Sequence, residues 1–341
     1  MAQLVQLLLG LAFCASVGHA QNDPKSPFDA QADAEYLHKA LNSNQQQSYQ
    51  SNITSILSRR RLQQRLQIAE KYKSSFGKNL ADDVTNYAEN CLFCSSFRRM
   101  GELMFSPLPV QYSHHLSKAM VGLGTTESVL TEILCGSQNA MIRNITQAYA
   151  ERYDGRSLLA DLEDDTSGNL RSLLVLLMQA NRSESNVTVY QDVTNDWLAL
   201  YNNGDINWRK NSSRLNEVLA RRDNQQIRWT FDELAQKTGK DFKEIFNEQF
   251  NFGTKNGYIT CVRVIQEPEE YFADVLNDAI NGLGTSEDDL VRVILTRSDM
   301  DDLDIISQVY KRKYGRRVVD DFKGNTGSTY KKMLIAFFED I

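Results

Sequence analysis

A tetrapeptide that occurs twice limits the folds open to this chain more than any other feature. Gly-Leu-Gly-Thr occupies residues 122–125 and again residues 282–285, 160 positions later. Apolar residues at helical spacing precede each copy, and a glutamate and a second helical segment follow it. Matching tyrosine pairs lie further along: Tyr149 and Tyr153, and Tyr310 and Tyr314. These shared surroundings indicate a repeated structural unit.

The spacing leaves room for a unit of about 80 residues between the two copies and for another before the first. Residues 29–57 and 192–219 fill these places with weaker copies of the helical pattern. No stretch of the chain alternates convincingly between apolar and polar residues, as a half-buried strand would. We therefore predict an all-α fold of four repeats. Their expected bounds are 29–108, 109–186, 187–268 and 269–341.

The first 20 residues differ from the rest. The run Leu4–Ala15 is almost entirely apolar, but it is shorter than the roughly 20 apolar residues that a membrane-spanning helix needs. The small residues Gly18 and Ala20 suit a signal peptidase. We interpret residues 1–20 as a secretory signal peptide and residues 21–28 as a short tail, which predicts an extracellular protein. The alternative is an N-terminal helix on a cytoplasmic protein.

Glycosylation sequons and cysteines agree with secretion. Five Asn-x-Ser/Thr sequons predict a glycoprotein: Asn52, Asn144, Asn181, Asn186 and Asn211. Four cysteines remain once Cys14 leaves with the signal: Cys91, Cys94, Cys135 and Cys261. Four cysteines allow three connectivities, and the sequence does not choose among them. The Cys91-Leu-Phe-Cys94 pair lacks the second ligand pair of a zinc site, so we favour inert thiols or one disulfide.

Composition and motifs exclude several classes of function. The net charge of −6 argues against a dedicated nucleic-acid binder. A mean hydropathy of −0.45 leaves no room for a polytopic membrane protein. The sequence contains no phosphate loop ending in Lys-Ser/Thr, no HExxH and no GxSxG motif. We therefore predict that the protein is not an enzyme.

With these repeats, the chain resembles the annexin family from about residue 28 to residue 341. The motifs are specific in the second and fourth repeats and degenerate in the first and third. The resemblance implies four annexin-like repeats of about five helices each, packed into a slightly curved disc. It also implies calcium sites on the convex face of that disc.

The residues of the tetrapeptide suit a calcium site. Ca²⁺ takes six to eight oxygen ligands, and the end of a helix leaves its last carbonyls without intrahelical partners. Two glycines tolerate positive φ, so several carbonyls can turn toward one point. That cage is neutral, and a carboxylate must come from elsewhere in the chain. The remaining ligand positions stay open to water or to a lipid phosphate.

The resemblance places the calcium ligands residue by residue. In the second repeat they are the carbonyls of Met120, Gly122 and Gly124 and the carboxylate of Asp165, with Thr125 and Glu127 at a weaker accessory site. In the fourth repeat the matching residues are Ile280, Gly282, Gly284 and Asn325, with Thr285 and Glu287. Asn325 offers one neutral oxygen where Asp165 offers a charged pair, so we expect a weaker fourth site.

The first and third repeats depart from the pattern, and we predict no calcium in either. Residues 42–48 replace the tetrapeptide in the first repeat, and Tyr87 falls near the carboxylate position. In the third repeat Arg209-Lys210 replaces Gly-Thr, and Gln249 falls near the carboxylate position. A cation in this loop would repel Ca²⁺.

Two other features have structural and functional interpretations. Two stretches of the chain are basic, one around Arg59–Arg61 and Arg65 and one at 311–317. Such stretches can bind anionic lipid or polysaccharide. The preferred interpretation is a solvated helix face with acidic neighbours. Trp208 either dips into a membrane interface or packs inside the protein.

The preferred function is calcium-dependent binding of acidic, phosphatidylserine-type membranes by a secreted annexin-like protein. Extracellular calcium modules work with weak sites, so a weakened fourth site remains usable. The alternative is a calcium-independent protein- or glycan-interaction module, an exported effector on a retained scaffold. Calcium dependence separates the two hypotheses.

Overall fold

The computed structural model describes residues 28–43, 46–87, 95–122, 124–185, 187–201, 204, 206–210, 212–282, 286–322 and 329–338. Within these ranges the chain is helical with no β-strand, which confirms the all-α prediction. None of the helices there is long and apolar enough to cross a membrane. The predicted signal peptide lies outside the described residues.

The helices form four groups of five along the described chain. The first group is α2 (Ala30–Leu41), α3 (Gln46–Arg59), α4 (Leu62–Phe76), α5 (Leu80–Tyr87) and α6 (Ser95–Leu103). The second is α7 (Leu108–Met120), α8 (Glu127–Gly136), α9 (Asn139–Arg152), α10 (Leu158–Asp165) and α11 (Gly168–Met178). The third is α12 (Tyr190–Tyr201), α13 (Ser213–Arg221), α14 (Asn224–Thr238), α15 (Phe242–Gln249) and α16 (Phe252–Gln266). The fourth is α17 (Pro268–Asn281), α18 (Glu287–Asp299), α19 (Leu303–Tyr314), α20 (Val318–Phe322) and α21 (Thr329–Ala336).

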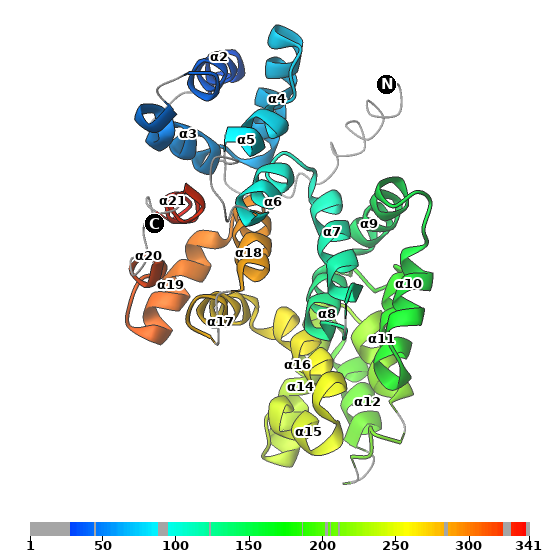
Figure 1. The fold of residues 1–341 in the computed structure, drawn as a ribbon. Helices are drawn as coiled ribbons and strands as arrows, with labels where there is room; N and C mark the ends of the chain where they lie inside the picture. The colour runs from blue at the N-terminus through cyan, green and yellow to red at the C-terminus, as the bar shows by residue number, and fades with distance from the viewer. Residues whose placement is uncertain are drawn as a thin grey trace.

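The four repeats pack in two pairs. Figure 1 shows the first repeat beside the fourth and the second beside the third. Helix α16 packs on α8 and α13 on α11 in one pair, while α21 packs on α3 and α18 on α6 in the other. Each repeat therefore buries its apolar helix faces mainly against its own helices and against the other repeat of its pair.

The matching tyrosines of the sequence fasten the third helix of a repeat to the fourth. Tyr149 of α9 donates a hydrogen bond to Asp161 Oδ2 of α10 at 2.6 Å. Tyr310 makes the same bond to Asp321 in the fourth repeat. Burial, and then the bond to Asp161, raise the pKa of Tyr149 to about 12. The hydroxyl therefore stays protonated and remains a donor at neutral pH.

A buried ion pair joins the second repeat to the fourth. Arg292 Nε of α18 lies 2.9 Å from Glu132 Oε1 of α8, and Tyr271 donates to the other carboxylate oxygen at 2.8 Å. Each charged residue stands seven positions after the threonine of its tetrapeptide, so equivalent positions of two repeats meet. Losing one partner of a buried pair costs about 3–5 kcal/mol. The pair therefore fixes how the two repeats sit against each other.

The prediction of a solvated basic face near residue 60 was wrong for two of its arginines, while Arg59 and Arg61 are exposed. Arg60 is buried and pairs with Asp33 at 2.7 Å. Arg65 is fully buried and reaches Asp299 of the fourth repeat at 2.5 Å. The acidic neighbours were expected, but they lie across helix interfaces rather than in solvent. The side chains are therefore structural.

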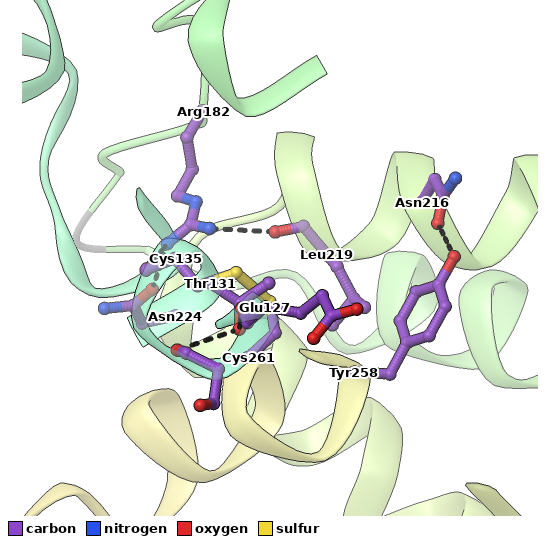
Figure 2. The surroundings of a disulfide bond; sticks show 10 residues. Glu127, Thr131, Cys135, Arg182, Asn216, Leu219, Asn224, Tyr258 and Cys261 are labelled. Carbon is purple, nitrogen blue, oxygen red and sulfur yellow. Dashed lines mark hydrogen bonds between the residues drawn. A yellow bond between two sulfur atoms is a disulfide. The ribbon is translucent and has the colours of Figure 1, made fainter. Parts of the chain in front are cut away.

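A disulfide joins Cys135 of α8 to Cys261 of α16, so the structure selects one of the connectivities that the sequence left open. Both side chains are fully buried where the second repeat meets the third (Figure 2). Arg182 covers the end of α8 by donating to the Cys135 carbonyl at 2.7 Å and to the Leu219 carbonyl at 2.9 Å. Cys91 and Cys94 lie outside the described residues.

Replacing both Cys135 and Cys261 with alanine should lower the stability of the protein. The bond closes a loop with a sequence separation of 126 residues, and native disulfides contribute typically about 2–4 kcal/mol to the free energy of unfolding. Thermal and denaturant unfolding measure the loss. A reductant should lower the melting temperature of the wild type and leave that of the double variant unchanged. Equal melting temperatures for wild type and variant under oxidising conditions would contradict the assigned bond.

Candidate metal site

The loop between α7 and α8 holds the first tetrapeptide in a tight turn. Helix α7 ends at Met120, and the amide of Thr126 donates back to the Ala119 carbonyl at 2.9 Å, which closes the loop. Gly122 and Gly124 have φ of 114° and 105°, a backbone region that residues with a Cβ rarely adopt. The glycines are therefore required by the turn, as the sequence predicted.

The expected carboxylate lies at this loop although it comes 40 residues later. Thr125 Oγ1 donates to Asp165 Oδ2 at 2.6 Å and to the Asp165 carbonyl at 2.9 Å. Asp165 ends α10 and is partly exposed. The structure thus brings together Met120, Gly122, Gly124, Thr125 and Asp165.

The residues at this loop fit calcium better than a transition metal. The described part of the chain holds no group of three or more His, Cys, Asp or Glu side chains that would bind a metal. A loop of backbone carbonyls with one carboxylate offers oxygen ligands only, which is the ligand type of Ca²⁺. Zinc sites use nitrogen and sulfur ligands in addition, and the loop has neither.

Glu127, the predicted accessory ligand, is placed against the third repeat. It begins α8, and its carboxylate lies over Gly253 of α16, where an added Cβ would come within 2.6 Å of Oε1. Figure 2 shows the side chain close to the disulfide. Glycine at position 253 therefore makes space for this carboxylate.

The fourth repeat closes its loop in the same way but with a different glycine geometry. The amide of Ser286 donates to the Ala279 carbonyl at 3.0 Å, as Thr126 does to Ala119. Gly282 has a φ of −71°, negative where that of Gly122 is positive, and a Cβ there would come within 2.4 Å of the Asp278 carbonyl. Ile280 is partly buried at the end of α17, and Glu287 begins α18. Gly284, Thr285 and Asn325 lie outside the described residues.

In the third repeat Arg209 takes the position of Thr125, one residue earlier than the sequence predicted, since the sequence placed Lys210 opposite that threonine. Arg209 Nε donates to the Gln249 carbonyl at 3.0 Å, again across 40 residues. The amide of Trp208 donates to Gln249 Oε1 at 3.2 Å. Trp208 itself is 3% exposed and donates its indole N–H to the Leu200 carbonyl at 3.0 Å. The tryptophan is therefore packed inside the protein and does not reach a membrane interface.

The first repeat also has a cation near its loop. Asn42 caps α2, and Lys78 Nζ donates to Asn42 Oδ1 at 2.6 Å. Tyr87, which sequence comparison placed near the carboxylate position, ends α5 and packs partly buried against the core. The described residues of this repeat thus supply no carboxylate at the equivalent place.

Asn169 was not foreseen from the sequence. It lies in the first turn of α11, four residues after Asp165, and its side-chain amide donates to the Arg209 carbonyl at 3.3 Å. The residue therefore ties the loop of the third repeat to the site of the second. Nothing in the repeat pattern marks it, because the contact runs between repeats.

Comparison with known proteins agrees with the repeat pattern. A family model described as Annexin matches residues 32–89, 111–177 and 271–337. Mouse annexin A13 is 37% identical over 310 residues, which cover 91% of this chain and 95% of that protein. The solved structure of annexin III superposes with a TM-score of 0.83 at 28% identity, covering 95% of this chain and 98% of the other. A calcium-bound annexin (Sm)1 superposes with a TM-score of 0.79 at 25% identity, covering 93% and 92%.

Replacing Gly124 with alanine should strain the loop. Its φ of 105° lies where a Cβ is disfavoured, and such strain costs about 1–3 kcal/mol. Gly136, at the end of α8, is the matched control, because its φ is not in the positive region and an added Cβ meets open space. Thermal unfolding without calcium should show a lower melting temperature for Gly124→Ala and little change for Gly136→Ala. Equal effects would show that the loop does not need this backbone geometry.

Proposed function

The chain belongs to the annexin family, whose members bind calcium and acidic phospholipids, and we propose that its second repeat holds the calcium ion that attaches it to such membranes. Annexins are generally non-enzymatic binding proteins. For this chain, the carrying observation is the hydrogen bond from Thr125 to Asp165. It places the one carboxylate of the predicted ligand set beside the glycine turn.

The proposed ligands have distinct tasks. The carbonyls of Met120, Gly122 and Gly124 supply neutral oxygens, and Asp165 supplies the negative charge. Thr125 orients that carboxylate through its hydroxyl. Bound calcium would offer open coordination positions to lipid phosphate oxygens, so lipid and calcium would each raise the affinity for the other. The calcium-bound annexin (Sm)1 neighbour supports calcium as the metal.

The fourth repeat is proposed as a second, weaker contact. Its loop closes with the same backbone hydrogen bond as the second repeat. Asn325 replaces the carboxylate in the sequence, and fewer charged ligands mean weaker calcium binding. Once the site of the second repeat is bound to a membrane, the fourth repeat is held close to the same surface. Its effective concentration there is high, so even a weak site adds to the overall affinity.

Replacing Asp165 with asparagine should raise the calcium concentration needed for half-maximal membrane binding by about tenfold or more, since ligand charge tunes calcium affinity over decades. The variant gives the second repeat the residue type of the fourth. Co-sedimentation with phosphatidylserine vesicles across a calcium titration, with a chelator blank, measures the shift. The exposed neighbour Asp164 provides the matched control, and Asp164→Asn should leave the midpoint unchanged.

Three outcomes of this titration differ in meaning. A shifted midpoint for Asp165→Asn alone supports the site. If the midpoint of Asp165→Asn is unchanged and binding still needs calcium, the main calcium site lies elsewhere in the chain. A wild type that does not sediment even at millimolar calcium favours the calcium-independent protein- or glycan-interaction module.

The protein is further proposed to act outside the cell as a glycoprotein. The apolar run and the small residues of positions 1–20 support a cleaved signal, and the five sequons agree with it. The disulfide between Cys135 and Cys261 adds structural support, because such bonds persist in oxidising compartments. Asn144 and Asn181 are exposed and accessible to a glycan.

Expression of the full sequence in a eukaryotic secretory host should release protein that begins at Gln21 and loses mass on treatment with an N-glycosidase. N-terminal sequencing and intact mass measure both changes. A protein that stays in the cytosol with an intact N-terminus would show that residues 1–20 are not a signal peptide. If the protein is secreted but loses no mass, the glycan proposal is wrong and the signal-peptide proposal stands.

A further inference from the structure

Two cations of the third repeat are exposed and form no ion pair with the carboxylates that the structure describes. Arg209 and Lys210 are both exposed. Among the ion pairs of the described residues, neither has a carboxylate within 4.0 Å, whereas two basic residues of α19 do: Arg312 with Glu270 and Lys313 with Asp274. A paired cation is already partly neutralised, so Arg209 and Lys210 are more available to an external anion than Arg312 and Lys313.

The cations occupy the place where the second repeat has its candidate calcium site. Arg209 donates to the Gln249 carbonyl at 3.0 Å, and Thr125 donates to the Asp165 carbonyl at 2.9 Å. Both contacts join the loop after the first helix of a repeat to the end of the fourth helix. The third repeat therefore has a permanent positive charge where the second is arranged to hold a metal ion.

The loop is anchored so that these charges are held in place. Trp208 is buried directly before Arg209 and packs against Phe246 at a ring-centroid distance of 5.2 Å. Its backbone amide and its indole N–H are both hydrogen-bonded, to Gln249 and to Leu200. The anchoring reduces the conformational entropy that the loop loses when it binds a surface.

The two loops lie on the same face of the molecule. Asn169, four residues after Asp165, donates to the Arg209 carbonyl at 3.3 Å. The Asn169 carbonyl accepts in turn from the side-chain amide of Asn216, which follows the Arg209 loop in α13, at 3.1 Å. Tyr258 of α16 supports Asn216 through a 2.6 Å hydrogen bond to Oδ1 (Figure 2). A surface that reaches the calcium loop therefore also reaches Arg209.

We propose that Arg209 and Lys210 form a second, calcium-independent contact with anionic headgroups of the membrane that the calcium loop of the second repeat binds. The inference rests on the proposed membrane function. Guanidinium and ammonium groups donate to lipid phosphates and carboxylates directly, so this contact needs no metal ion. It assigns a role to a repeat whose loop has lost the calcium pattern.

Electrostatic attraction to an anionic bilayer sets the expected size of the effect. Each Lys or Arg near such a surface changes affinity by about fivefold, and two cations together by about thirtyfold. The attraction is screened by salt. The contribution of the pair should therefore fall as ionic strength rises.

The test compares Arg209→Gln/Lys210→Gln with the wild type on phosphatidylserine-containing vesicles at saturating calcium. Vesicle titration at low and at physiological salt gives the lipid dissociation constant. The double variant should bind about thirtyfold more weakly at low salt, with a smaller ratio at higher salt. The matched control, Arg209→Lys/Lys210→Arg, keeps both charges and should bind like the wild type. Thermal unfolding checks that all three proteins are folded.

A second arm separates this contact from calcium binding. The same pair of substitutions in the Asp165→Asn background should weaken lipid binding by the same ratio, because the cations act without the metal of the second repeat. Equal affinities for wild type and double variant overturn the inference while leaving calcium-dependent binding intact. If the two substitutions no longer change the lipid dissociation constant in the Asp165→Asn background, the contact is not independent of calcium. Absence of any calcium-dependent binding by the wild type overturns the proposed function instead.

Discussion

The ion pair between Arg292 and Glu132 links the two pairs of repeats inside the molecule. The two residues hold equivalent positions in their repeats, each in the helix that directly follows its glycine loop, and they meet inside the molecule at 2.9 Å. A buried arginine needs a carboxylate, because an unpaired charge in the interior is costly. Burial favours the neutral form of the guanidinium, but Glu132 and Asp289 outweigh it and raise the pKa of Arg292. The charge therefore persists, and the relation between the two calcium-type loops is fixed from within.

The second constraint is local and recurs within repeats. A residue in the loop after the first helix bonds to the carbonyl of a residue at the end of the fourth, through Thr125 in the second repeat and Arg209 in the third. Each link is made by the side chain of the loop residue and joins segments 40 residues apart. A threonine hydroxyl and an arginine guanidinium both serve as the donor, so the link is kept whether the loop side chain is neutral or charged. A repeat can therefore keep this link without the residues of the predicted calcium site.

The features that recur along the chain were predictable from sequence. The helices and the glycine turn repeat in register, so the pattern located them, and the resemblance to annexins placed Asp165 as the carboxylate ligand. Features formed between repeats were not predictable. The partners of Cys135 and Arg65 are 126 and 234 residues away, and neither partner is marked by local periodicity. Trp208 could not be placed because the same residue type suits a membrane interface and a core, and only its packing against Phe246 decides.

Charge balance connects the two proposed membrane contacts. A protein of net charge −6 is repelled by an acidic bilayer unless positive charge gathers on the docking face. Many of the chain's own cations cannot serve, because Arg65, Lys313 and Arg316 are paired with carboxylates. The second repeat would take its positive charge from calcium, and the third has Arg209 and Lys210 in the same face. Calcium would then decide whether the protein binds, while the fixed cations set how tightly it stays and how strongly salt opposes it.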